Sequence, residues 1–153
     1  MIGVGSRLHS KHPLLADRIL SSSEAAKRAV SAAVCLALEH AALDAALGHA
    51  ILVAVDGGPE LDAELVTKIR ALQEARDDSY LDASSKSIAT DAPNSDALRA
   101  FRQSRALAAL VLAVEGQSAS QAAEVVYEAL ASCEDEARAV ARLEAASGAP
   151  AGA

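Results

Sequence analysis

Aromatic residues are nearly missing from this chain of 153 residues, which has one Phe, two Tyr and no Trp. This scarcity excludes an aromatic platform for stacking nucleic-acid bases, and it leaves few large side chains to fill a core. Ala takes their place with 38 residues. Because Ala has the highest helix propensity and the β-formers are sparse, the composition predicts an all-α protein. Thin helical cores often gain stability by oligomerising, so the composition also fits a homodimer.

Positive charge is in short supply as well, since 14 Lys and Arg stand against 21 Asp and Glu, for a net charge of -7. A nucleic-acid binder usually has a basic face, so we expect no nucleic-acid partner. The start of the chain lacks the basic-then-apolar order of a signal peptide. The most apolar region, 32–55, is interrupted at Glu39, His40, Asp44 and His49, so we expect no membrane span. These features favour a cytoplasmic protein, and the Ala-rich composition resembles that of a GC-rich bacterial genome.

Motifs for catalysis and cofactor binding are absent from the sequence. It has no phosphate-binding Gly-rich loop, no Gly-x-Ser-x-Gly, no Cys-x-x-Cys and no repeated Glu-x-x-His. The two cysteines, Cys35 and Cys133, are 98 positions apart in apolar helical surroundings, so we interpret both as buried free thiols rather than as a disulfide. We therefore predict no catalytic residue, no metal and no cofactor.

Helical apolar periodicity is what the chain has in abundance. Its strongest stretch is 104–114, where nine successive residues after Arg105 carry no polar side chain. A helix that is apolar on every side belongs in the middle of a helical assembly. We predict one domain over residues 1–146, an up-down bundle of four main helices plus a short N-terminal helix, with this helix at the centre. A disordered tail is expected at 147–153.

The other helices are located by their apolar stripes and by signals at their ends. The five expected ranges are 13–20, about 21–55, 59–76, 96–115 and 118–143. Residues 1–12 are expected to be a loop, with exposed histidines. Capping-box spacing predicts helix starts near Ser21 and Ser118. Ser132 and Asp135 have the same spacing, which predicts a kink there.

The second helix contains an ambiguous segment at residues 51–55, Ile-Leu-Val-Ala-Val. Taken alone, this segment resembles a buried strand. The apolar phase of the helix continues into it through Gly48, and the chain offers no partner strand, so we favour helix. Asp-Gly-Gly-Pro at 56–59 ends the helix, and Pro59 is expected to begin the next one.

Residues 77–95 interrupt the helical pattern with a polar, Ser- and Asp-rich sequence. We predict a long loop here, because the segment is too polar for a helix of the bundle. A connection of this length inside a compact domain is usually functional or disordered. Its candidate partner-binding residues are Asp77, Asp78, Tyr80 and Asp82.

Arg99, Arg102 and Arg105 step by three along the start of the helix at 96–115. Cations near a helix N-terminus oppose its dipole by roughly 0.3–1 kcal/mol each when exposed, so an acidic group is expected nearby. The structural interpretation pairs these arginines with the Asp-rich segment at 77–95. The functional interpretation makes Arg99 and Arg102 contacts for an anionic ligand or an acidic partner surface.

His40 and Asp44 are one helical turn apart if the second helix is continuous, so their side chains would meet on one face. The functional interpretation is a base with its orienting carboxylate, or a pair of ligand-binding groups. The structural interpretation is a satisfied polar pair in an Ala-rich helix. Catalysis requires a third group, and the sequence indicates none.

The order of the segments carries a resemblance. A long Ala/Leu helix, a Gly-Gly-Pro turn at 57–59 and a polar loop precede a hairpin of 105–115 and 118–130, joined at Gly116. In this layout the chain resembles small all-helical bacterial proteins, some of them immunity proteins encoded beside toxins. The resemblance implies that the protein binds and neutralises a protein partner. A basic partner would suit the acidic chain.

Two functional hypotheses result. The first is a non-catalytic protein-binding module of the bacterial cytoplasm, of the immunity or regulatory kind, which contacts its partner through its acidic surface and the segment at 77–95. The second is a small-ligand-binding or enzymatic bundle with a pocket near His40 and Asp44.

Overall fold

The protein is all-α in its computed structural model, which describes residues 7–57, 62–90, 95–116 and 118–147. Across these four ranges the chain forms helices and no strand, as predicted. The eight helices are α1 (Arg7–Lys11), α2 (Pro13–Leu20), α3 (Ser23–His40), α4 (Ala45–Gly57), α5 (Ala63–Thr90), α6 (Ser95–Glu115), α7 (Ala119–Ala131) and α8 (Glu136–Ser147). The expected tail at 148–153 lies outside the described residues.

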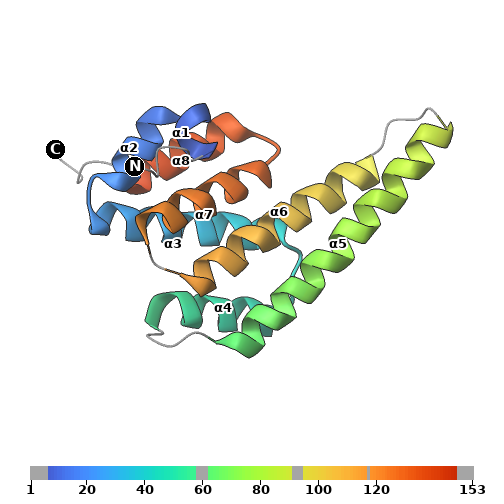
Figure 1. The fold of residues 1–153 in the computed structure, drawn as a ribbon, viewed down its shortest axis with the longest axis horizontal. Coiled ribbons are helices and arrows are strands. Elements are labelled where there is room, and N and C mark those ends of the chain that lie inside the picture. The colour runs from blue at the N-terminus through green and yellow to red at the C-terminus, as the bar shows by residue number, and fades with distance from the viewer. Residues whose placement is uncertain (1–6, 58–61, 91–94, 117, 148–153) are drawn as a thin grey trace.

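Helix α6 runs through the middle of the assembly and packs against α3, α4, α5 and α7 (Figure 1). Its second half is the apolar stretch at 104–114, and Leu107 and Leu110 within it are fully buried. The prediction of a central helix is therefore confirmed. The other large side chains that are fully buried come from neighbouring helices, and they include Leu8, Leu15, Ile19, Val34, Ile51, Ile69, Val125, Val126 and Leu143.

The predicted helix over 21–55 is wrong in its continuity, because α3 ends at His40 and α4 begins at Ala45. Ala42 at the corner has a φ of 57°. Asp44 starts the new helix by accepting a hydrogen bond from the Leu47 amide at 2.8 Å, which is the action of an N-cap. The turn also brings Ile51 into the core, where it is fully buried. The segment at 51–55 is helical, as favoured above.

The predicted loop at 77–95 is also wrong, because α5 continues as one helix of 28 residues to Thr90. Polar residues are accommodated in this helix because the Ser79 and Ser85 hydroxyls donate to carbonyls four residues earlier. Asp62 caps the start of the helix by accepting from the Leu65 amide at 3.0 Å. The expected start at Pro59 lies outside the described residues.

Several local signals predicted the helix ends correctly. Helix α2 has the predicted bounds of 13–20, and α6 covers 95–115 against the predicted 96–115. Ser118 caps α7 as predicted, accepting from the Gln121 amide at 3.1 Å, whereas the cap of α3 is Ser22 rather than Ser21. The predicted kink near Cys133 is a full break, and Asp135 caps α8.

The N-terminal segment departs from the predicted loop, because Arg7–Lys11 forms α1 and buries Leu8 completely. His12 is half-buried, and its Nε2 lies 2.9 Å from Glu136 Oε2 on α8. Arg7 reaches Glu124 on α7 at 2.6 Å. These pairs hold the N-terminal helices against the C-terminal pair. Over the described ranges, no helix is both long and apolar enough to cross a membrane.

Candidate interaction surface

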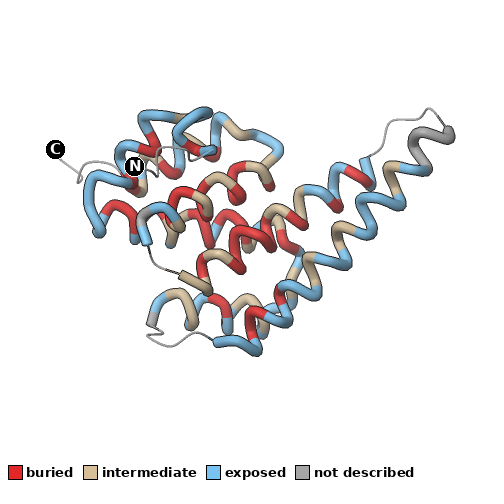
Figure 2. The backbone as a smooth tube through the Cα atoms, in the orientation of Figure 1, coloured by how far each residue is buried: buried red, intermediate tan, exposed pale blue. Residues whose placement is uncertain are grey.

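The outer halves of α5 and α6 project beyond the rest of the molecule as a two-helix arm (Figure 1). We define the arm as residues 77–90 of α5 and 95–103 of α6, and the body as the remaining described residues. Figure 2 shows buried positions throughout the body and few along the arm. On α6 the arm buries Ala97 and Ala100, which are too small to bury much apolar area.

Among the side chains that the structure describes on this arm, four large apolar ones are exposed. Tyr80 is 37% exposed, Leu81 62%, Leu98 52% and Phe101 39%. The Tyr80 and Phe101 rings contact each other across the two helices, with centroids 5.7 Å apart at an interplanar angle of 52°. We call these four residues the apolar patch. Two of the three aromatic residues of the whole chain therefore lie on one exposed surface.

Charge on the arm is divided between its two helices. Asp77, Asp78 and Asp82 lie on α5, and Asp78 and Asp82 are exposed. Arg99 is exposed on α6, 3.5 Å from Asp96 of the same helix, and Arg102 is half-buried. The six predicted partner-binding residues thus all lie on the arm, on a helical surface rather than on the predicted loop.

The base of the arm is fixed by a polar cluster. The Ser104 hydroxyl donates to Asp77, and Arg105 lies 4.0 Å from the same carboxylate. Arg105 also donates to Glu128 on α7 at 2.8 Å. One of the three arginines thus meets the acidic segment, as the structural interpretation predicted; Asp91 of that segment lies outside the described residues.

Glu128 is the most deeply buried carboxylate of this cluster, with 6% of its side chain exposed. Burial raises the pKa of Glu128, and the nearby Arg105 and Arg7 oppose that rise. Arg7 lies 3.8 Å from its second oxygen. The cluster joins α1, α5, α6 and α7 at the point where the arm leaves the body, so it fixes the direction of the arm.

His40 and Asp44 do not share a helical turn, so the predicted pairing on one helix face is wrong. The residues between them form the corner between α3 and α4. The two residues line different hollows. His40 lies in one of about 600 Å³ with Glu39, Cys133 and Arg142, and Asp44 lies in one of about 440 Å³ with Asp62 and Lys68.

Two of the charged residues that line the hollow beside His40, Arg142 and Glu39, pair with each other. Arg142 donates to Glu39 at 2.6 Å, and this bond holds the pKa of the Glu39 carboxyl below its usual range. Burial raises the pKa of the Cys133 thiol, which disfavours the reactive thiolate. Both cysteines are free, but Cys35 is exposed, so its predicted burial is wrong.

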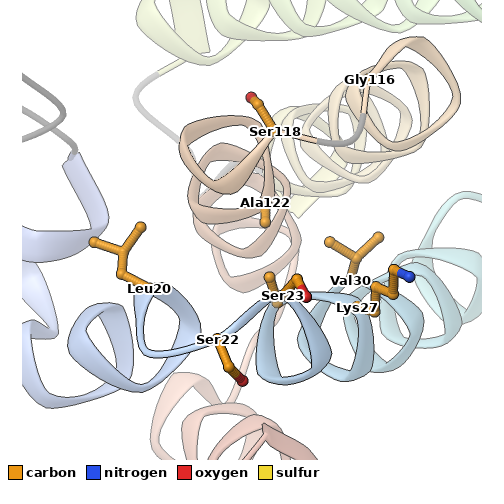
Figure 3. A pocket seen from close by; sticks show the side chains of 9 residues that line it. Leu20, Ser22, Ser23, Lys27, Val30, Gly116, Ser118 and Ala122 are labelled. Carbon is orange, nitrogen blue, oxygen red and sulfur yellow. The ribbon is translucent and has the colours of Figure 1, made fainter.

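A third hollow, of about 200 Å³, lies where α2, α3 and α7 meet (Figure 3). Leu20, Val30 and Ala122 form its apolar wall. Ser22 and Ser118 also line it, but their hydroxyls are occupied as helix caps, at 3.0 Å from the Ala25 amide and 3.1 Å from the Gln121 amide. The volume is below the ~300–1,000 Å³ of typical ligand pockets. We interpret this hollow as a packing gap at a three-helix junction.

Metal-ligating side chains do not gather into any group of three among the described residues. Comparisons with known proteins add no site, since no family model, curated protein or solved structure matches the chain at a significant level. The assignment of a functional surface therefore depends on the geometry of the molecule alone.

Sequence reasoning included Tyr80 but missed Leu98 and Phe101 of the apolar patch. Both lie inside the helix predicted at 96–115, where neither was assigned a role. One signal was available: in a chain with three aromatic residues, two lie within 22 positions of each other, at 80 and 101.

Proposed function

We propose that this protein is a non-catalytic protein-binding module and that the arm is its contact surface. The observation that carries the proposal is the apolar patch, four large apolar side chains left exposed on a projecting helical hairpin, two of which, Tyr80 and Phe101, contact each other. Contiguous exposed apolar surface in a folded protein is typical of interaction sites. Aromatic residues are enriched in protein interfaces, where they supply large contact areas.

The rest of the arm fits the anatomy of an interface. Charged residues on both helices border the patch, as a polar rim borders the apolar centre of a typical contact. The polar cluster at Arg105 and Glu128 holds the arm in place before binding, so less conformational entropy is lost when a partner docks. For a partner of different sequence, the specific form of this proposal is an immunity or regulatory role, in which binding neutralises that partner.

The hollow beside His40 supports a second candidate function, the binding of a small ligand. Its volume of about 600 Å³ is within the range of ligand pockets, and Arg138 and His40 are among its lining residues. A thermal-shift screen of small anions and amino acids, with His40→Ala as comparison, tests this candidate. A shift that disappears in the variant would support it.

The test of the main proposal compares two leucine substitutions at opposite ends of the molecule. Leu98→Asp places a charge in the apolar patch, and Leu14→Asp places one on α2, at a side chain that is 73% exposed. Each variant and the parent protein are tagged, expressed in the native host and purified with whatever protein binds them. Circular dichroism establishes that both variants are folded.

We expect the parent protein and Leu14→Asp to retain one stoichiometric protein partner, and Leu98→Asp to lose it. Mass spectrometry identifies the partner, including an untagged copy of the same chain. Retention of the partner by folded Leu98→Asp would contradict the assignment of the arm as the contact surface.

A further inference from the structure

We infer that the partner of the arm is a second copy of this chain, bound so that α5 of each copy lies against α6 of the other. The two arms would form a four-helix assembly with two-fold symmetry. This inference rests on the proposed function, because it uses the same surface and names the partner that covers it.

The first argument is the distribution of apolar side chains on the arm. Ala97 and Ala100 face α5 and are buried, whereas Leu98 and Phe101 on the same helix are exposed. The pairing of α5 with α6 thus covers the small residues fully, whereas it leaves Leu98 and Phe101 partly exposed, although the Phe101 ring contacts Tyr80. Two helices alone cannot enclose an apolar core, whereas four can. A second arm supplies the two helices that are missing.

The second argument is charge complementarity between the two helices of the arm. Among the described side chains of the arm, α5 carries the exposed acids Asp78 and Asp82, whereas α6 carries Arg99 and Arg102 with one acid, Asp96, at 3.5 Å from Arg99. A two-fold contact brings the same surface of both copies together, so each copy must complement itself. Contact of α5 with α6 of the other copy satisfies this requirement twice, whereas contact of α5 with α5 would bring acids together.

The third argument is the location of exposed apolar surface. Within the described part of the chain, eight large apolar side chains are exposed, and the four on the arm are the ones with an aromatic contact between two helices. The other four are divided between α2, with Leu14 and Leu20, and α4, with Leu52 and Val53. Association through the arm would therefore bury the larger single group of exposed apolar side chains.

The test uses charge reversal on each helix separately. One variant carries Asp78→Lys with Asp82→Lys, and the other carries Arg99→Glu with Arg102→Glu. In the first, both helices of the arm become basic; in the second, both become acidic. A matched control reverses two exposed cations of the body on α3, Lys27→Glu with Arg28→Glu. Mass in solution is measured by sedimentation equilibrium, and circular dichroism establishes that each protein is folded.

We expect the parent protein and the α3 control to have twice the mass of one chain. Each arm variant alone should show a twofold fall in mass, because like charges oppose each other in both halves of the contact. An equimolar mixture of the two arm variants should return to the doubled mass, because each basic arm then meets an acidic one. Recovery in the mixture also demonstrates that neither variant failed through misfolding.

Three outcomes would overturn the inference: a monomeric parent protein, arm variants that remain dimeric, or a mixture that fails to recover the doubled mass. The proposed function is tested separately by the Leu98→Asp purification. If the parent protein is a monomer that binds a different host protein, and the Leu98→Asp variant loses that protein, the inference is overturned and the proposed function is not. A monomer that binds no protein would overturn both.

Discussion

The body and the arm of this protein are both built from helices, but different interactions stabilise them. Helix α6 belongs to both regions, which makes the comparison direct. In the body, Leu107 and Leu110 of α6 are fully buried by neighbouring helices on several sides. In the arm, α6 runs beside α5 and away from the other helices (Figure 1), and Leu98 and Phe101 are exposed. Both regions are helical, but tertiary burial is extensive in the body, whereas on α6 of the arm it is limited to Ala97 and Ala100.

Electrostatic contacts differ between the two regions as well. In the body, ion pairs connect helices that are distant in sequence, as Arg142 does with Glu39 and Arg7 with Glu124. In the arm, Arg99 pairs with Asp96 of the same helix, and Asp77 at the base of the arm lies 4.0 Å from Arg105 on the neighbouring helix. Ion pairs of the body therefore join elements that are far apart in the chain, whereas the ion pairs described for the arm join residues of α5 and α6 alone.

The largest contrast is expected from leucine truncation at two positions of the same helix. Leu110→Ala removes a fully buried side chain and should lower the free energy of unfolding by about 3 kcal/mol, through lost transfer energy and a cavity. Leu98→Ala removes an exposed side chain and should change the free energy of unfolding of the monomer by less than about 0.5 kcal/mol. Urea denaturation at low protein concentration measures both. Equal losses would show that the arm is as well packed as the body.

The polar cluster at the base of the arm should give the next largest effect. Arg105→Met leaves the buried Glu128 with Arg7 as its remaining cation at 3.8 Å, and should destabilise the protein by about 2 kcal/mol. The double variant Arg105→Met with Glu128→Met removes both charges and should recover most of that loss. Urea denaturation of the three proteins checks this. A double variant as unstable as the single one would contradict the role given to the uncompensated carboxylate.

The carboxylates of Glu128 and Glu39 should make the stability of the protein depend on pH with opposite signs. Burial raises the pKa of Glu128 above its ordinary 4.5, so its protonated form favours folding, and that contribution is lost as the pH rises above 4.5. The hydrogen bond from Arg142 lowers the pKa of Glu39, so its contribution is present above 4.5 and is lost as the pH falls below that value.

Stability measured between pH 3 and pH 7 compares Glu128→Gln and Glu39→Gln with the parent protein. Relative to Glu128→Gln, the parent should lose stability as the pH is raised from 4.5. Relative to Glu39→Gln, it should lose stability as the pH is lowered from 4.5. If the stability of the parent relative to each variant changed with pH in the same direction, the environments described for Glu128 and Glu39 would be contradicted.

The smallest effect is expected at the corner between α3 and α4. Ala42 has a φ of 57°, in the left-handed region that disfavours residues with a Cβ atom. Ala42→Gly should therefore stabilise the protein by about 0.5–1 kcal/mol, and the gain belongs to the body alone. Urea denaturation should show the gain in the monomer, while sedimentation should show no change in association. A loss of stability would show that the corner is not strained.

Local signals in the sequence were sufficient for the fold class and for several helix ends. Pro13 begins α2 and Ser118 caps α7, because each acts on the residues next to it. The end of α3 at His40 escaped prediction because the apolar phase continues through the corner. Asp44 was interpreted as a partner of His40, whereas its side chain caps α4.

The arm was the least predictable region because its structure depends on contacts between distant segments. The polarity of residues 77–90 indicated a loop, yet the segment is helical where it packs along α6. Tyr80 was found from its size, but its contact with Phe101 joins two helices that sequence periodicity cannot place side by side. The apolar patch exists only once that pairing is formed.

Amide hydrogen exchange at two protein concentrations tests the contrast between the regions most directly. The concentrations are chosen below and above the dimer dissociation constant obtained by sedimentation. We expect amides at 77–85 and 95–103 to exchange more slowly at the higher concentration, because a second arm covers them, while amides at 104–114 of α6 keep the same rate. Arm amides whose protection is independent of concentration would show that no second copy covers the arm.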